Sequence, residues 1–395
     1  MAGQAAVWRR GPGDPDRETF LDLFFDLVFV FAMFQLSHSL LEHLRWSDAF
    51  QTGVLLLASW LLWNHTAAVC DRHDPHRPVI QVLVIGAMFG GFVLAAVLPG
   101  AFGGHGLAFA TAYVAIQFGR PLFLAVITRG DERRREVRGL FWCGLSAIPW
   151  LAGGAVHGWG RAVLWAVAVA VDYGAIRLGW PTPVLGRRRA AEFAASGDFL
   201  GERHREFFII ALGEPVVLSG LTIDRTGFGA GHVAATAVAL VSVTVLWRMY
   251  LYRAGQVLGE AVEAASDPLR VAIPAVYGHP VMVAGVVAIS VGDELAITRP
   301  YGHIEPAWVA VILGGPAIFL VGRSVFEYAV FSRVSWHRVL GIIVLGAISP
   351  AMLRTSPLLA SLAATLVLAG VAAVDQAHVW RHPGEPPRPP STRPA

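Results

Sequence analysis

The chain has 395 residues, of which 55% are hydrophobic and only 15% are charged, and its formal net charge is +3. Soluble domains carry about a quarter charged residues, so the composition excludes an ordinary soluble protein, and so small a charge gives no argument for nucleic acid binding. All 31 basic residues are arginine, and two cysteines are too few for a disulfide framework. The composition therefore predicts a membrane protein.

The first apolar stretch, residues 19–44, is long enough to cross a bilayer but carries ionisable side chains. At roughly 100° per residue, Asp22 and Asp26 fall on one side of a helix, while His38 and Glu42 fall on roughly the opposite side. An ionised group at mid-bilayer costs roughly 2.5 kcal/mol or more. We therefore expect this helix inside a bundle, where it contacts protein or water on two sides.

Apolar runs of spanning length recur to the end of the chain. They predict an all-α, polytopic membrane helix bundle with about 12 transmembrane helices. The expected spans are 19–44, 48–69, 77–98, 104–127, 139–156, 160–180, 204–223, 232–252, 270–292, 306–327, 336–353 and 357–379.

Arginine placement predicts the orientation of these spans. With the N-terminus in the cytoplasm, 23 arginines fall in inner segments, five fall in outer loops, and three lie within spans. The positive-inside rule then places both termini in the cytoplasm. The expected location is the cell (inner) membrane.

The sequence also contains a weak internal duplication. The segment 81–123 parallels 281–326, and both end in Gly-Arg-x-x-Phe, beginning at Gly119 and Gly322. The first span would then correspond to the one that starts near Glu202. An even number of helices per half predicts two six-helix pseudo-repeats related by an axis along the membrane normal. The expected organisation is a disordered cytoplasmic leader (1–18), a first half (19–180), a cytoplasmic linker (181–203), a second half (204–380) and a disordered Pro-rich tail (381–395).

Four strings carry a family resemblance. They are DLFFDLVFVFAMFQLSH from Asp22, DPHRP from Asp74, ERHREFFIIALGE from Glu202, and YGHPVMVAGVV with the later GDEL in 277–295. Together they resemble the bacterial low temperature requirement A (LtrA) family across about 18–380. The resemblance implies a bacterial multi-pass membrane protein; it does not assign a biochemical activity.

Carboxylates in the first helix of each half are the main candidates for chemistry. Asp22 and Asp26 lie one turn apart, so in a low dielectric one of them is expected to hold a proton. The alternative for Asp22 is a helix-start position in the headgroup region. Glu214 precedes Pro215, which should break the helix near mid-membrane and expose a carboxylate and carbonyls to a solute; the alternative is a purely structural kink.

Other polar residues within the spans extend this candidate site. His38 and Glu42 form an i,i+4 pair that is either a relay or interfacial. Asn64 and His65 lie beside two tryptophans, for which the alternative is an aromatic belt. Asp172 lies well inside the sixth span.

Buried charges are usually paired. We therefore expect an arginine within the spans to neutralise Asp26, Asp172 or Glu214. The candidates are Arg120, Arg248 and Arg177, although Arg120 and Arg177 lie near inner ends, where snorkelling is the alternative. Acidic residues at span ends are expected to be solvated; these are Asp293, Glu294 and Asp375. The ligand-type residues of the loop 71–76 lack the spacing of a known metal motif, so no metal and no cofactor are predicted.

These residues favour a secondary transporter or exchanger of a small solute, with proton coupling as an option. Asp26 and Glu214 would form its central site, with Asp22, His38, Asn64, His65 and Asp172 around it. The alternatives are an ion channel, a membrane-embedded enzyme acting on a lipid, and a non-catalytic sensor; an enzyme is less favoured. The expected partners are the lipid bilayer and a small solute or ion, with no nucleic acid, and the oligomeric state stays open.

Overall fold

The computed structural model describes residues 20–187, 197–251, 258, 261–262 and 268–381. The expected leader and almost all of the expected tail lie outside these residues. Within them the regular structure is helical, apart from isolated bridge positions such as the pair Thr182 and Gly186. The all-α prediction is confirmed for the described part of the chain.

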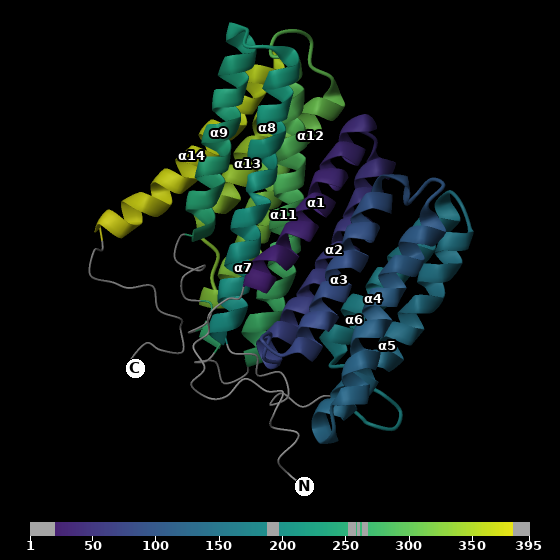
Figure 1. The fold of residues 1–395 in the computed structure, drawn as a ribbon. Helices are drawn as coiled ribbons and strands as arrows, with labels where there is room; N and C mark the ends of the chain where they lie inside the picture. Colours follow the sequence, from purple (N-terminus) through teal and green to yellow (C-terminus); the bar gives the residue numbers. More distant parts are fainter. Residues whose placement is uncertain (1–19, 188–196, 252–257, 259–260, 263–267, 382–395) are drawn as a thin grey trace. The chain divides into compact units, whose positions relative to one another are not determined.

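The chain divides into two compact units. Unit 1 comprises Met1–Ser39 and Ser47–Ala195, and unit 2 comprises Leu40–Trp46 and Ser196–Ala395. The helices numbered first are α1 (Phe20–Glu42), α2 (Trp46–Arg72), α3 (Pro78–Val97), α4 (Gly106–Ile127), α5 (Gly130–Ala155) and α6 (Trp159–Leu178). A short 3₁₀ helix, η2 (Leu98–Gly100), follows α3. Figure 1 labels the α-helices of both units.

Unit 2 contains the remaining helices. They are α7 (Gly197–Ala211), α8 (Gly213–Thr226), α9 (Ala230–Leu251), α11 (Pro268–Thr298), α12 (Pro306–Phe331), α13 (Trp336–Met352) and α14 (Pro357–Arg381). Each of the expected spans coincides with one helix, except that 204–223 is divided between α7 and α8. α7 begins within the range expected as the linker.

Nine segments of the described chain are long and apolar enough to cross a membrane. The pair α7 and α8 counts as one of them, and α13 is a shorter apolar helix. Helices α5 and α6 fall outside the nine, and α5 begins with the charged run from Asp131 to Arg135.

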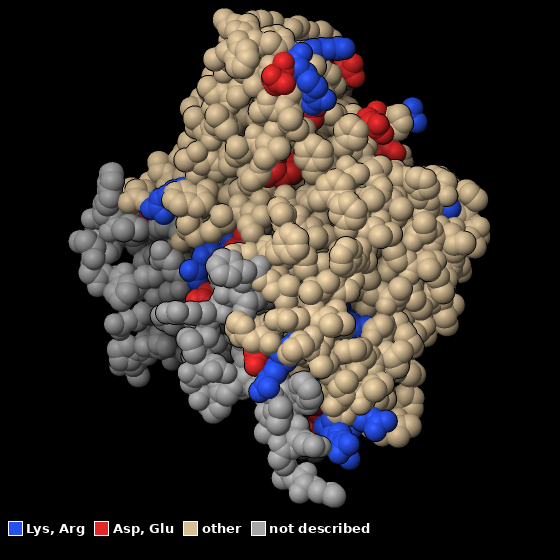
Figure 2. Space-filling view, in the orientation of Figure 1, with Lys and Arg blue, Asp and Glu red and all other residues tan. Residues whose placement is uncertain are grey.

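Large apolar side chains lie exposed on many of these helices. Phe89 is 72% exposed and Val126 is 76% exposed, and the described surface in Figure 2 is mostly uncharged. Exposure of many large apolar side chains is typical of surfaces that contact other proteins or a membrane. It agrees with the lengths of the helices.

Glycines bring α11 and α12 together backbone to backbone. Gly278, Gly285 and Gly292 recur every seven residues on α11, and Gly315 and Gly322 share that spacing on α12. A Cβ built on Gly285 would lie 2.5 Å from the amide nitrogen of Phe319. The absence of side chains therefore permits the close packing of these two helices, as small residues do in membrane bundles. We call this contact the glycine seam.

Arg161 joins the end of α5 to the loop after α3. Its side chain is 1% exposed. The guanidinium donates to the carbonyls of Ala101 and Gly103, at 2.7 and 2.6 Å, and Nε donates to those of Gly153 and Val156, at 3.0 and 2.9 Å. It thus satisfies carbonyls that a helix end leaves without amide partners.

The prediction that Asp293, Glu294 and Asp375 are solvated is wrong. Their exposed fractions are 5%, 8% and 4%. α11 continues to Thr298, six residues past the expected span, so the first two acids lie inside a helix. The side chains that pair with these acids come from other helices. A hydropathy profile does not show which helices become neighbours, so it could not predict this pairing.

Asp375 belongs to a buried ionic group, which we call the Arg338 cluster. Arg338, 0% exposed, donates to Asp375 at 3.0 Å and to Glu327. His337 contacts Asp375 at 2.8 Å, and Ser335 donates to Glu327 from both its backbone amide and its hydroxyl. The cluster ties α12, α13 and α14 together.

His73, directly after α2, makes stability depend on pH. Its side chain is 2% exposed, and burial together with the charge of Arg72 lowers the pKa of His73 to about 4. The pKa of a histidine in the unfolded chain is ~6.5. The contribution of the buried neutral ring to folding stability is therefore fully present above that pH, and it is lost as the pH falls toward the folded pKa of about 4. Acidification from pH 7 to pH 4 should cost up to about 3 kcal/mol through this group. Thermal unfolding in detergent across this range measures it.

The variant His73→Gln separates this contribution from other titrations. It should unfold with a smaller dependence on pH than the unmodified protein, whereas His157→Gln, at an exposed position, should not change that dependence. Equal pH dependence in the unmodified protein and His73→Gln would show that His73 does not carry the effect.

Candidate functional site

Three polar side chains lie on one face of α4 inside unit 1. Tyr113, Gln117 and Arg120 have the i, i+4, i+7 spacing that places residues on one side of a helix. Their exposed fractions are 1%, 4% and 7%. Helices α2, α5 and α6 supply their partners, so a polar layer lies within the apolar bundle.

The hydrogen bonds of this layer have a defined direction. A guanidinium only donates, and Arg120 Nη2 contacts Gln117 Oε1 at 2.8 Å. This bond turns Gln117 Nε2 toward the Tyr113 hydroxyl, to which it donates at 3.1 Å. The hydroxyl in turn donates to Asp172 Oδ2 at 3.0 Å. The direction therefore runs from Arg120 to Asp172.

Side chains of three further helices complete this group. Trp150 on α5 donates to Asp172 Oδ2 at 3.2 Å, so the carboxylate of α6 accepts two hydrogen bonds. His65 Nδ1 on α2 lies 3.4 Å from Gln117 Oε1, and Arg120 also donates to Thr66 Oγ1 at 3.4 Å. The seven residues form what we call the polar chain: His65, Thr66, Tyr113, Gln117, Arg120, Trp150 and Asp172.

Asp26 on α1 is buried completely, with 0% of its side chain exposed. Its Oδ1 accepts a hydrogen bond from Trp63 Nε1 on α2 at 2.7 Å. Trp63 is itself buried, and its ring packs 4.9 Å from that of Trp60. These tryptophans thus line the interior of unit 1, rather than the aromatic belt that was the alternative interpretation.

Glu214 lies where the helix is interrupted in unit 2. α7 ends at Ala211 and α8 begins at Gly213, so the predicted break is confirmed. Glu214 is 2% exposed, and its Oε1 accepts a hydrogen bond from Ser290 Oγ of α11 at 2.9 Å. It occupies the first turn of α8, where the helix dipole favours a negative charge.

Four other predicted residues are not members of the polar chain. Asp22 belongs to α1, but its side chain lies outside the described residues. His38 is exposed and Asn64 is half-buried. Arg248 donates to Gln376 of α14 in unit 2. Of the nine predicted residues, the polar chain therefore unites His65, Arg120 and Asp172.

Comparison with known proteins identifies the family. Residues 17–373 match the family described as bacterial low temperature requirement A protein (LtrA). The chain belongs to the LtrA family. It is 34% identical over 357 residues to Uncharacterized protein RA0937 of Rhizobium meliloti (strain 1021), a match that covers 88% of this chain and 86% of that protein. No solved structure gives a significant match.

Family membership and the apolar helices together establish a multi-pass membrane protein. Within this LtrA chain the sequence prediction missed Tyr113, Gln117 and Trp150. The i, i+4 and i+7 spacing of polar residues on α4 was a visible signal for the first two, whereas the indole of Trp150 reads as one apolar residue among many. Arg120 reaches Asp172 through Gln117 and Tyr113, rather than by direct contact.

Proposed function

We propose that this LtrA protein is a secondary transporter or exchanger of a small solute, coupled to protons through the carboxylates within its helices. The observation that carries the proposal is the Asp172 carboxylate, which accepts hydrogen bonds from Tyr113 of α4 and Trp150 of α5. Asp26 in unit 1 and Glu214 in unit 2 are the further ionisable groups that we assign to this role. Each is buried in its own unit.

Protonation of Asp172 would change how firmly α6 is tied to its neighbours. Hydrogen bonds to an ionised carboxylate are roughly twice as strong as those to a neutral group. Uptake of a proton would therefore loosen the bonds from Tyr113 and Trp150 together. A link between proton binding and helix packing of this kind is what proton-coupled transport requires.

We further propose the topology that accompanies this function. The protein would lie in the inner membrane with both termini in the cytoplasm, as the arginine distribution favours. The two halves would be six-helix pseudo-repeats related by an axis along the membrane normal. Cysteine-accessibility labelling of the two termini in intact and opened cells tests the orientation.

Proton flux into reconstituted vesicles tests the function. Vesicles that enclose the pH indicator pyranine are given external Na⁺, K⁺, Ca²⁺ or a mixture of amino acids, and internal pH is followed. At least one addition should move protons across vesicles with the unmodified protein. Asp172→Asn should lower this flux about tenfold or more, because the amide cannot take up the coupled proton and loses the hydrogen bonds to a charged group, which contribute about 1.5–3 kcal/mol. Tyr113→Phe, which retains the acid, should lower it less.

Asp131→Asn serves as the matched control, because the Asp131 side chain is 88% exposed. Its flux should equal that of the unmodified protein. Solute-driven flux that is unchanged in Asp172→Asn would refute the role of Asp172. Unitary currents in a planar bilayer would instead support an ion channel.

A further inference from the structure

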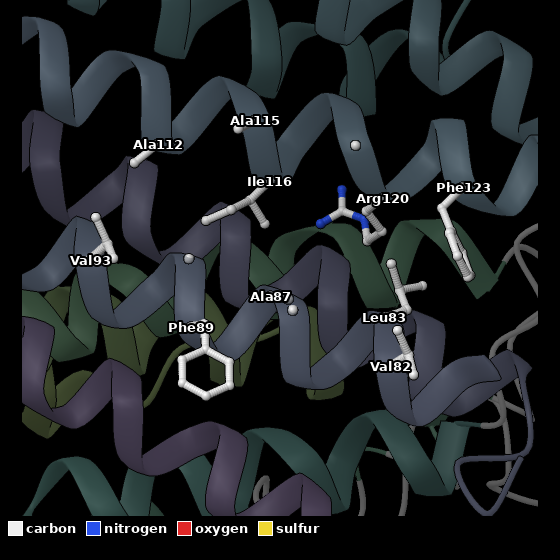
Figure 3. A pocket seen from close by; sticks show the side chains of 13 residues that line it. Val82, Leu83, Ala87, Phe89, Val93, Ala112, Ala115, Ile116, Arg120 and Phe123 are labelled. Atoms are coloured by element: carbon white, nitrogen blue, oxygen red, sulfur yellow. The ribbon is translucent and has the colours of Figure 1, made fainter. Parts of the chain in front are cut away.

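A groove of about 520 Å³ lies between α3 and α4 in unit 1 (Figure 3). Its α3 side extends from Val82 to Val93, about 16 Å along the helix axis. Val82, Phe89 and Val93 are 64%, 72% and 51% exposed, so the groove is open along its length. Both helices are among the nine that can cross a membrane. In a bilayer, lipid chains would therefore fill this groove.

Arg120 is the one charged residue among those that line the groove. Arg120 is 7% exposed, and its guanidinium donates to two neutral side chains, Thr66 and Gln117. Three of its five N–H groups are not used in these bonds. Within the described part of the chain no carboxylate forms an ion pair with it, and Glu136 of α5 acts only at longer range. Buried charges are normally paired. The Arg120 guanidinium can therefore bind an anionic group that enters the apolar groove.

We propose that the groove binds one anionic phospholipid of the surrounding bilayer. An acyl chain would lie between α3 and α4, and the negatively charged phosphate would meet Arg120. Arg120 precedes Ile127, the last residue of α4, by seven residues, which is about 10 Å along the axis. Arg120 therefore lies close enough to the end of α4 for a lipid headgroup to reach it when the headgroup is drawn into the bilayer. A guanidinium suits a phosphate because it donates two parallel hydrogen bonds. This inference concerns lipid binding and is independent of the transporter proposal.

Two kinds of variant distinguish binding of the lipid headgroup from binding of its acyl chain. Arg120→Gln keeps a polar side chain but removes the charge. Gly119→Leu and Gly86→Leu fill the groove instead, and a Cβ at either position has no atom within 4 Å, so the helices accept it without a clash. Leucine is also a better helix former than glycine. The controls are Gly53→Leu, where a Cβ likewise meets no atom within 4 Å, and Arg134→Gln at a side chain that is 66% exposed.

Native mass spectrometry of the full chain, extracted from vesicles of phosphatidylglycerol and phosphatidylcholine in equal amounts, measures the bound lipid. The unmodified protein should retain phosphatidylglycerol about tenfold more than phosphatidylcholine. Both lipids carry a phosphate, but the choline cation offsets its charge in phosphatidylcholine, so only phosphatidylglycerol has a net negative charge to pair with Arg120. Arg120→Gln should remove this preference, and the two groove-filling variants should lower retention of both lipids. Both control variants should behave like the unmodified protein.

Three results would overturn the proposal. They are an unchanged lipid preference in Arg120→Gln, unchanged lipid retention in both groove-filling variants, and displacement of phosphatidylglycerol by an equal amount of palmitate. The last would assign the groove to a free fatty acid. Because the readout is bound lipid, a failure here leaves the flux experiment on Asp172 unaffected.

Discussion

Arg338→Met should destabilise the folded protein by about 3–5 kcal/mol, the usual effect of removing one partner from a buried ion pair. Arg338 is 0% exposed and donates to both Glu327 and Asp375. Methionine fills a similar space but leaves two carboxylates buried without that guanidinium. The free energy of unfolding, measured in mixed detergent micelles by denaturant titration, should show this loss.

A matched control and a compensated variant make this result specific. Arg333→Met changes an exposed arginine in the loop before α13 and should leave stability within about 0.5 kcal/mol. Adding Glu327→Gln and Asp375→Asn to Arg338→Met should restore much of the lost stability, because no uncompensated charge remains. If Arg338→Met alone is as stable as the unmodified protein, the cluster does not hold α12, α13 and α14 together.

Gly285→Ala should lower stability by roughly 2–3 kcal/mol, at the upper end of the usual cost of overpacking. The new methyl group would lie 2.5 Å from the amide nitrogen of Phe319 and 2.8 Å from its Cα. These are backbone atoms, so no side chain can rotate away and α11 must separate from α12. Thermal unfolding in detergent and the yield of monodisperse protein report the change.

The matched control lies on the partner helix. Gly314 has no atom within 4 Å of a built Cβ, whereas on its neighbour Gly315 a Cβ would lie 2.8 Å from the amide nitrogen of Ile289. Gly315→Ala should therefore destabilise, and Gly314→Ala should stabilise slightly, because alanine is about 1 kcal/mol better than glycine within a helix. Equal effects of the two substitutions would mean that helix propensity, and not the glycine seam, governs stability here.

The fold was largely predictable from the sequence because membrane spans are set by length and apolarity. Each predicted span meets a helix, and Pro215 marked the interruption between α7 and α8. The errors lie where several elements interact. Asp293 and Asp375 follow apolar runs and resemble span ends, yet tertiary partners on other helices let the chain bury them.

The candidate site was predictable only in part. Asp172, His65 and Arg120 stood out because an ionisable or polar group within an apolar span is costly and needs a partner. Their connection runs through Gln117 and Tyr113, and sequence alone does not specify which helices become neighbours. Arg120 illustrates the difference: the sequence indicated a charge that needs an acid, whereas its bonds are to neutral groups in the polar chain.

The glycine seam also limits how α11 and α12 can slide past each other. Its repeat of seven residues corresponds to about 10 Å of axial rise. A shift by one helical turn would set bulky side chains of one helix against the backbone of the other, and only a shift by the full repeat would again align glycine with glycine. The pair is thereby fixed in a single register. In any rearrangement of unit 2, α11 and α12 should move together as one rigid body.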